Sequence, residues 1–231
     1  NDPMRKDLTE RLAASVYKQG EAKRAAGDGS GAVDDFLRVA MLAPASPVRA
    51  TAEYDAAAQL IALKQWERAI GVLEGFRASY PQNALQPDVT KKLAVAYSEA
   101  GHPAQAAVEF EKIAGTASED AAVRREALAT AADLYEKAGN SAKTVAVLER
   151  YVAQYESPFN EALEARQRLL DIAAKSGNAQ RVQYWQKEIV RVDATAGAAR
   201  LSERAKAAPP CRARLGAAAV NKRMRSRDLL P

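Results

Sequence analysis

The chain has 231 residues and a formal net charge of +5, with 48% apolar and 27% charged residues. This length and balance are sufficient for a substantial hydrophobic core and exclude a disordered polyelectrolyte. Charged residues interrupt every apolar run before it could cross a bilayer, so we expect no transmembrane segment. The chain starts at Asn1 without a basic, apolar leader, and we expect this end to be a processing site or a fragment boundary.

Five helical hairpins are predicted in succession, each with a short turn between its two helices. The turns lie at residues 26–28, 63–65, 100–102, 138–140 and 176–178, and their central residues are spaced by 37, 37, 38 and 38 residues. Four central residues are glycine, which ends a helix in the left-handed conformation, and Lys64 is the exception. Asp28, Asn140 and Asn178 follow three of these turns and are predicted to begin the next helix as N-caps.

Small and apolar residues recur at helical spacing in both helices of the hairpins. Leu93, Ala94 and Tyr97 predict a buried stripe on one first helix, and Ala131, Ala132 and Tyr135 repeat it one period later. On the second helices, a small residue is followed one turn later by a large one, which predicts close helix crossing and core filling. These pairs are Ala32 and Phe36, Ala69 and Leu73, Ala106 and Phe110, Thr144 and Leu148, and Val182 and Gln186. In the last pair, glutamine stands at an expected core position.

Over about residues 12–195, this pattern resembles the tetratricopeptide repeat (TPR) family. The resemblance is carried by the turn glycines and by Gly20, Ala57, Ala94, Ala132, Ala32, Ala69, Ala106, Pro44 and Pro81. The family period is about 34 residues, and the family's early tryptophan is absent here. The longer period and the Phe76-x-x-x-Tyr80-Pro81 ending resemble TPR proteins of the proteobacterial envelope, of the Tol-Pal coordinator and barrel-assembly lipoprotein type.

The resemblance implies an all-α fold in which about five TPR-like hairpins form a right-handed superhelix over residues 1–195. A basic, partly helical C-terminal segment at 196–231 would form a cap or a tail. The first helix of each hairpin would line a concave face that binds a protein or peptide. The side chains expected on that face are Tyr17, Arg24, Tyr54, Lys91, Glu126, Asp133, Glu136, Gln167 and Asp171.

This face begins with apolar and aromatic residues and ends with acidic ones. It suggests a peptide ligand with an apolar segment followed by basic residues. The alternative is a solvated face without ligand preference. We expect a non-catalytic scaffold within a multiprotein assembly, in the bacterial periplasm or cell envelope, with the cytoplasm as the alternative location.

Few residues in the sequence could perform catalysis. The only histidine, His102, stands in a turn, and the sequence has no Gly-x-Ser-x-Gly motif. The single cysteine, Cys211, excludes an internal disulfide and a cysteine-based zinc site. Residues 27–32 copy part of a dinucleotide fingerprint but follow a predicted helix instead of a strand. We therefore expect no enzymatic activity, metal or cofactor.

The basic charge is concentrated at the C-terminus. Residues 1–199 contain 25 Lys and Arg against 27 Asp and Glu, whereas residues 200–231 contain nine against two. The balanced repeats argue against nucleic acid as their ligand. The stretch 212–227, with six basic residues, suits nucleic acid or acidic phospholipid, or alternatively packs as a cap. A short helix is predicted at 199–208. The sequence leaves the partner's identity and the oligomeric state open.

Overall fold

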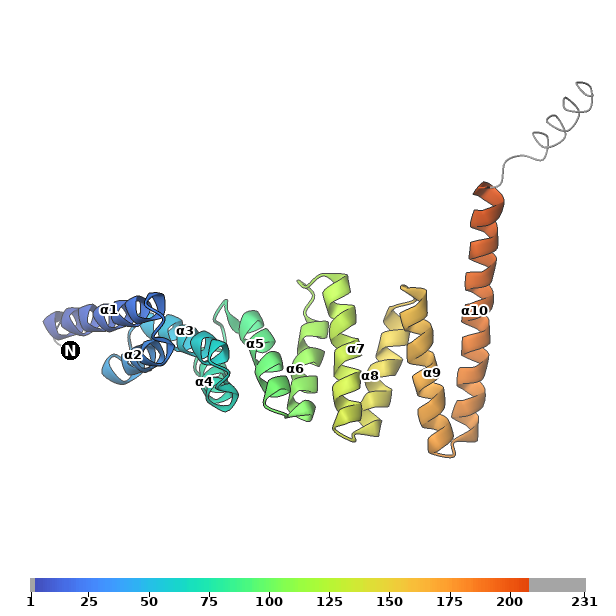
Figure 1. Ribbon diagram of the computed structural model, residues 1–231, viewed down its shortest axis with the longest axis horizontal. Coiled ribbons are helices and arrows are strands. Elements are labelled where there is room, and N and C mark those ends of the chain that lie inside the picture. The colour runs from blue at the N-terminus through green and yellow to red at the C-terminus, as the bar shows by residue number, and fades with distance from the viewer. Residues whose placement is uncertain (1–2, 208–231) are drawn as a thin grey trace, which may run out of the picture. The chain divides into compact units, whose positions relative to one another are not determined.

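The computed structural model describes residues 3–207, without the side chains of 196 and 198–207 (Figure 1). These residues form ten α-helices and no strand. The helices are α1 (Pro3–Ala25), α2 (Gly29–Leu42), α3 (Val48–Ala62), α4 (Trp66–Ser79), α5 (Gln86–Glu99), α6 (Pro103–Gly115), α7 (Ala121–Lys137), α8 (Ser141–Gln154), α9 (Phe159–Lys175) and α10 (Ala179–Ala207). The chain divides into two compact units, Asn1–Tyr155 with α1–α8 and a second unit from Glu156 onward with α9 and α10. The predicted all-α class of tandem helical hairpins is confirmed.

Within the first unit, hairpins α1–α2, α3–α4, α5–α6 and α7–α8 stack in chain order, and each helix packs against the next one along the chain. Their axes turn progressively, so that α1 runs at a steep angle to α7 and α8 (Figure 1). Each hairpin alone buries only part of its apolar surface, and stacking on its neighbours buries the rest.

All five predicted turns adopt the left-handed backbone conformation at their central residue. The φ angles are +83° at Gly27, +58° at Lys64, +81° at Gly101, +71° at Gly139 and +69° at Gly177. Lys64 adopts this conformation too, although the sequence indicated it only for the four glycines. L-residues pay a steric cost there because Cβ crowds the backbone.

The same backbone hydrogen bond closes each of the five turns. The N–H of the residue after the turn centre donates to the carbonyl five residues earlier in all five hairpins, at 2.8–3.0 Å. This is the six-to-one bond of a Schellman motif, which satisfies a carbonyl left open at the helix end. The predicted N-caps are also confirmed. Asp28, Asn140 and Asn178 accept a hydrogen bond from the N–H three residues ahead, at 2.8, 3.1 and 3.1 Å.

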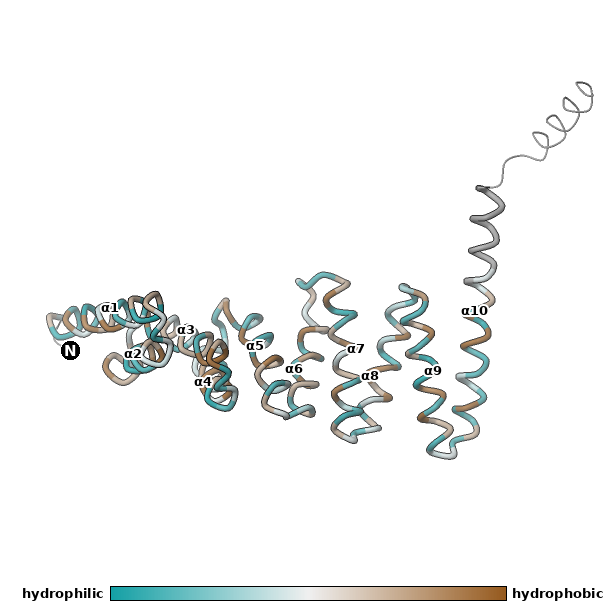
Figure 2. The backbone as a smooth tube through the Cα atoms, viewed as in Figure 1, coloured by the Kyte–Doolittle hydropathy of each residue, from teal (hydrophilic) through white to brown (hydrophobic). Residues whose placement is uncertain are grey.

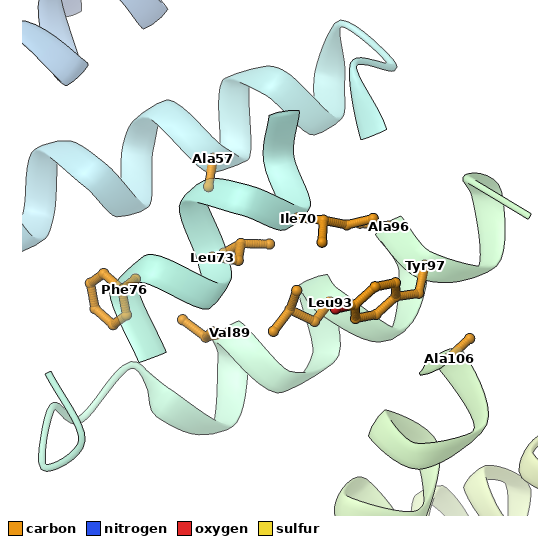
Figure 3. Close-up of a cluster of buried hydrophobic side chains, with 9 residues drawn as sticks. All are labelled: Ala57, Ile70, Leu73, Phe76, Val89, Leu93, Ala96, Tyr97 and Ala106. Carbon is orange, nitrogen blue, oxygen red and sulfur yellow. The ribbon is translucent and has the colours of Figure 1, made fainter. Parts of the chain in front are cut away.

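The core consists of apolar clusters that span consecutive hairpins. One cluster joins α3, α4, α5 and α6, and its residues Leu73, Phe76 and Leu93 are fully buried (Figure 3). The predicted core residues Tyr97 and Tyr135 are 8% and 2% exposed. Along α1–α9 hydrophobic and hydrophilic residues alternate around each helix, as burial of one face requires (Figure 2).

Gly20 shows why the first hairpin needs a small residue in α1. A Cβ atom at this position would lie 2.7 Å from two ring carbons of Phe36 on α2. Phe36 is fully buried, so its ring has little room to move away. The close crossing of α1 and α2 therefore depends on the missing side chain.

In the second unit, α9 and α10 form the fifth hairpin, and its core differs from the prediction by one residue. Trp185 is 5% exposed, whereas Gln186, expected at a core position, is exposed. The prediction for Gln186 is wrong. The repeat spacing of the earlier hairpins placed residue 186 in the core, whereas in α10 the preceding residue, Trp185, is buried.

The C-terminal part of the chain is described only in part. The short helix predicted at 199–208 is the end of α10, which continues from Ala179 to Ala207 without a break at 195/196. The predicted division into a repeat array at 1–195 and a basic C-terminal segment at 196–231 stays a prediction. Cys211 and the basic stretch 212–227 lie outside the described residues.

Candidate functional site

The first helices of the hairpins lie closer together than the second helices at the beginning of the first unit. Cα atoms of α1 and α3 come within 8 Å of each other, as do those of α3 and α5. No Cα pair of α2 and α4 comes that close. A stack of hairpins with this asymmetry curves toward its first helices. We call the exposed side of α1, α3, α5 and α7 the first-helix face.

Tyr17 and Tyr54, two of the predicted partner-binding residues, connect consecutive first helices. The Tyr17 hydroxyl on α1 donates to Asp55 Oδ2 on α3 at 2.5 Å. The Tyr54 hydroxyl on α3 donates in the same way to Asp88 on α5. The two rings pack against Phe36 and Phe76, with ring centroids 5.3 and 6.2 Å apart.

The pKa values of Tyr17 and Tyr54 are both raised, which keeps their hydroxyls protonated as donors in these hydrogen bonds. Burial, followed by the hydrogen bond to Asp55, raises the pKa of Tyr17 to about 12. Burial and then the bond to Asp88 likewise raise the pKa of Tyr54. Both phenols therefore stay neutral donors at physiological pH. Arg24, also predicted on this face, is 3.7 Å from Asp55 Oδ1 and 3.9 Å from Glu21.

Lys91 stands on α5 where the repeat placed Tyr17 and Tyr54 on the earlier first helices. Its ammonium is 2.7 Å from Glu119 Oε1, in the connection between α6 and α7. No tyrosine-carboxylate pair joins α5 to α7 among the described residues, and no Cα atoms of these two helices lie within 8 Å. One turn beyond Lys91, Val95 is 47% exposed.

The predicted acidic residues of α7 are all exposed. Glu126 and Asp133 are seven residues apart and share one side of the helix, and Glu136 lies one turn further. Glu126 forms no ion pair with any described residue, whereas Asp133 and Glu136 have interactions within the chain. The first unit thus brings Tyr17, Arg24, Tyr54, Lys91 and these three carboxylates onto consecutive first helices, as predicted.

Gln167 and Asp171, the remaining predicted residues, lie on α9 in the second unit. Both are exposed, and the Gln167 amide donates to Asp171 Oδ1 at 3.0 Å, one helical turn away. The structure therefore joins these two to each other.

Sequence reasoning missed the carboxylates that hold the two tyrosines. Asp55 follows Tyr17 by 38 residues, and Asp88 follows Tyr54 by 34. An acidic residue about one period after each tyrosine was the available signal. It is a weak one, because the two offsets differ by a full helical turn.

The only histidine of the sequence, His102, lies at the surface of the first unit. His102 Nε2 is 2.8 Å from the exposed Glu67 side chain, at the surface turn between α5 and α6. Nearby, a hollow of about 420 Å³ is lined by residues 64–68, Glu99 and Ala100, which mix both charges. Among the described residues, no three His, Cys, Asp or Glu side chains are grouped to hold a metal ion. None of the helices in that range is long and apolar enough to cross a membrane.

Tandem helical hairpins with Schellman-type turns define a helical-repeat protein. Residues 51–83, which are most of hairpin α3–α4 and its closing Pro81, match the family model of the tetratricopeptide repeat. TPR repeats are supported in this chain, and proteins built from them are generally scaffolds that bind other proteins.

Several solved structures resemble the chain. The TPR-like repeats of a Podosopora anserina protein described as a kinesin light chain are 22% identical, cover 82% of this chain and 97% of that one, and have a TM-score of 0.44. MamA is 15% identical over 77% of this chain and 96% of its own, with a TM-score of 0.44. A tetratricopeptide repeat protein from Parabacteroides merdae is 14% identical over 78% and 66%, with a TM-score of 0.48.

These TM-scores are all below 0.5, and we infer no function from the three structures. No curated protein matches the chain.

Proposed function

We propose that this protein is a non-catalytic scaffold that binds a polypeptide partner through its first-helix face. The observation that carries the proposal is the close approach of α1, α3 and α5, which gathers side chains of separate hairpins on one side of the first unit. An extended or helical partner segment laid across several hairpins would contact each of them in turn. We further propose that it acts in a multiprotein assembly of the bacterial envelope, which the long repeat period and the Phe76 to Pro81 ending support.

The test is capture of the partner from the native host by the purified full-length chain, followed by cross-linking and mass spectrometry. Cross-links from the partner should concentrate on residues of α3, α5 and α7. Charge reversal at Glu126 and Asp133 should weaken the captured complex. Asp34→Lys is the matched control, because Asp34 is an exposed carboxylate on a second helix. Equal retention of the partner by both kinds of variant would contradict the first-helix face.

The location is tested separately by fractionating the native host. Recovery of the protein with periplasmic or envelope markers is the expected outcome. Recovery with cytoplasmic markers would refute the envelope proposal and leave the binding proposal standing.

A further inference from the structure

We propose that Tyr17 and Tyr54 are positioning residues, which fix the curvature of the first-helix face before a partner binds. Each tyrosine holds the next first helix close through a carboxylate on that helix. The benefit to binding rests on the proposed function, because a face that is fixed in advance loses less conformational freedom when its ligand arrives. Neither tyrosine then needs to touch the partner itself.

The ring of each tyrosine is anchored in its own hairpin. Tyr17 on α1 packs on the fully buried Phe36 of α2, with ring centroids 5.3 Å apart. Tyr54 on α3 packs on the fully buried Phe76 of α4, with centroids 6.2 Å apart. Core packing within the hairpin therefore determines where each hydroxyl lies.

The hydroxyl of each tyrosine bonds to the next first helix. Tyr17 donates to Asp55 Oδ2 on α3 at 2.5 Å, and Tyr54 donates to Asp88 on α5. A hydrogen bond from a hydroxyl to an ionised carboxylate is charge-assisted and about twice as strong as a neutral one. Arg24 adds a longer link from α1, 3.7 Å from Asp55 Oδ1. Each tyrosine thus connects the core of one hairpin to the first helix of the following hairpin.

The spacing of the first helices follows the same pattern. Cα atoms of α1 and α3 come within 8 Å of each other, as do those of α3 and α5, and a tyrosine bond joins both pairs of helices. Between α5 and α7, Lys91 stands in the place of the tyrosine and pairs with Glu119 in the connection before α7. No Cα atoms of α5 and α7 come within 8 Å. Close approach of two first helices and a tyrosine-carboxylate bond therefore occur together.

The test measures the distance between α1 and α5 in the full chain by pulsed electron paramagnetic resonance. Spin labels are attached at Lys18→Cys and Val95→Cys, two exposed positions, after Cys211→Ser removes the single native cysteine. The double variant Tyr17→Phe/Tyr54→Phe keeps both rings and removes both hydroxyls. We expect its distance distribution to shift to longer values and to broaden, because the hydroxyls no longer hold α3 and α5.

Two controls separate this effect from a general loosening of the stack. The Tyr97 hydroxyl on α5 donates to Glu74 on α4, so Tyr97→Phe loses the same kind of bond without releasing one first helix from another. Its distance between α1 and α5 should equal that of the unaltered chain. A second label pair, at the exposed positions Asp34→Cys on α2 and Val108→Cys on α6, reports on the second helices. In the double variant, this distribution should broaden less than that of α1 and α5. Circular dichroism establishes that each variant is folded.

An unchanged distance between α1 and α5 in the double variant would overturn the inference, because packing alone would then set the curvature. An equal shift in Tyr97→Phe, or equal broadening of the second-helix pair, would overturn it as well. This measurement needs no partner, so its outcome is independent of the capture experiment that decides the scaffold proposal. A captured partner should dissociate faster from the double variant than from Tyr97→Phe, and equal dissociation would refute the role of the two tyrosines in binding.

Discussion

Arg77 on α4 forms a bidentate ion pair with Glu109 on α6. Its Nη1 donates to Oε1 at 2.9 Å and its Nη2 donates to Oε2 at 2.5 Å. Glu109 is 4% exposed, and Lys112 also contacts its carboxylate at 2.7 Å. The pair joins the second helices of neighbouring hairpins. A bidentate arginine-carboxylate pair combines fixed geometry with charge-assisted hydrogen bonds.

Arg77→Met should lower the free energy of unfolding by about 2 kcal/mol, because it leaves a buried carboxylate with only Lys112 as a cationic partner. Urea unfolding measures this loss. Arg150→Met is the comparison, since Arg150 is more exposed and makes a single bond of 3.1 Å to Glu111. That variant should lose less than about 1 kcal/mol. Equal losses in the two variants would mean that the buried Arg77–Glu109 pair stabilises the protein no more than the exposed Arg150–Glu111 pair.

Stability should fall in acid through Glu109. Burial alone would raise the pKa of Glu109, but hydrogen bonds from Arg77 and Lys112 outweigh it and lower this pKa below its usual value. The stabilisation is therefore complete above the unfolded-state pKa of about 4.3 and is lost as pH falls through the lower folded-state pKa. Unfolding by urea at a series of pH values measures the slope. Glu109→Gln should flatten it, and an unchanged slope would assign the acid sensitivity to other carboxylates.

Lys64→Gly should stabilise the protein by about 0.5–1 kcal/mol. Lys64 has a φ angle of +58°, where glycine avoids the steric cost that a Cβ atom brings. Thermal and urea unfolding provide the measurement. Gly101→Ala tests the same turn position in reverse and should cost about 1 kcal/mol. Nothing lies within 4 Å of a Cβ atom there, so the cost is conformational. Destabilisation by Lys64→Gly would reveal a contact of the lysine side chain that outweighs the backbone strain.

Tyr97 should contribute mostly through packing. Tyr97→Ala should cost about 3–5 kcal/mol, the range for removing a large aromatic ring from a core. Tyr97→Phe removes only the hydroxyl that donates to Glu74, and it should cost about 1 kcal/mol. If phenylalanine were as damaging as alanine, the hydrogen bond would be the dominant contribution.

The sequence was sufficient to predict the turns, because each of them depends on residues next to one another in the chain. Gly27 and its equivalents stand where the backbone needs a positive φ angle, and Asp28, Asn140 and Asn178 cap helices that begin beside them. Lys64 adopts the same conformation without the glycine that indicated it elsewhere. The sequence also predicted burial of Tyr97 and Tyr135, since a buried helix face repeats with the helical period.

Contacts between hairpins were not predictable in the same way. The partner of each tyrosine depends on how far one helix is displaced along the next, and this displacement is set by packing of the whole interface. Asp55 and Asp88 consequently lie at different offsets from their tyrosines. The wrong prediction for Gln186 has the same cause. Packing of α9 and α10 decides which residues of α10 are buried, and it buries Trp185 instead of its neighbour Gln186. The role of the predicted face in binding stays a prediction.

The chain has two tryptophans, and each compact unit contains one of them, half-buried Trp66 in the first and buried Trp185 in the second. The protein therefore carries an intrinsic fluorophore for each unit. With excitation selective for tryptophan, Trp66→Phe would leave emission only from the second unit, and Trp185→Phe only from the first. Comparing the melting curves of these two variants would reveal whether the units lose their structure together or one after the other.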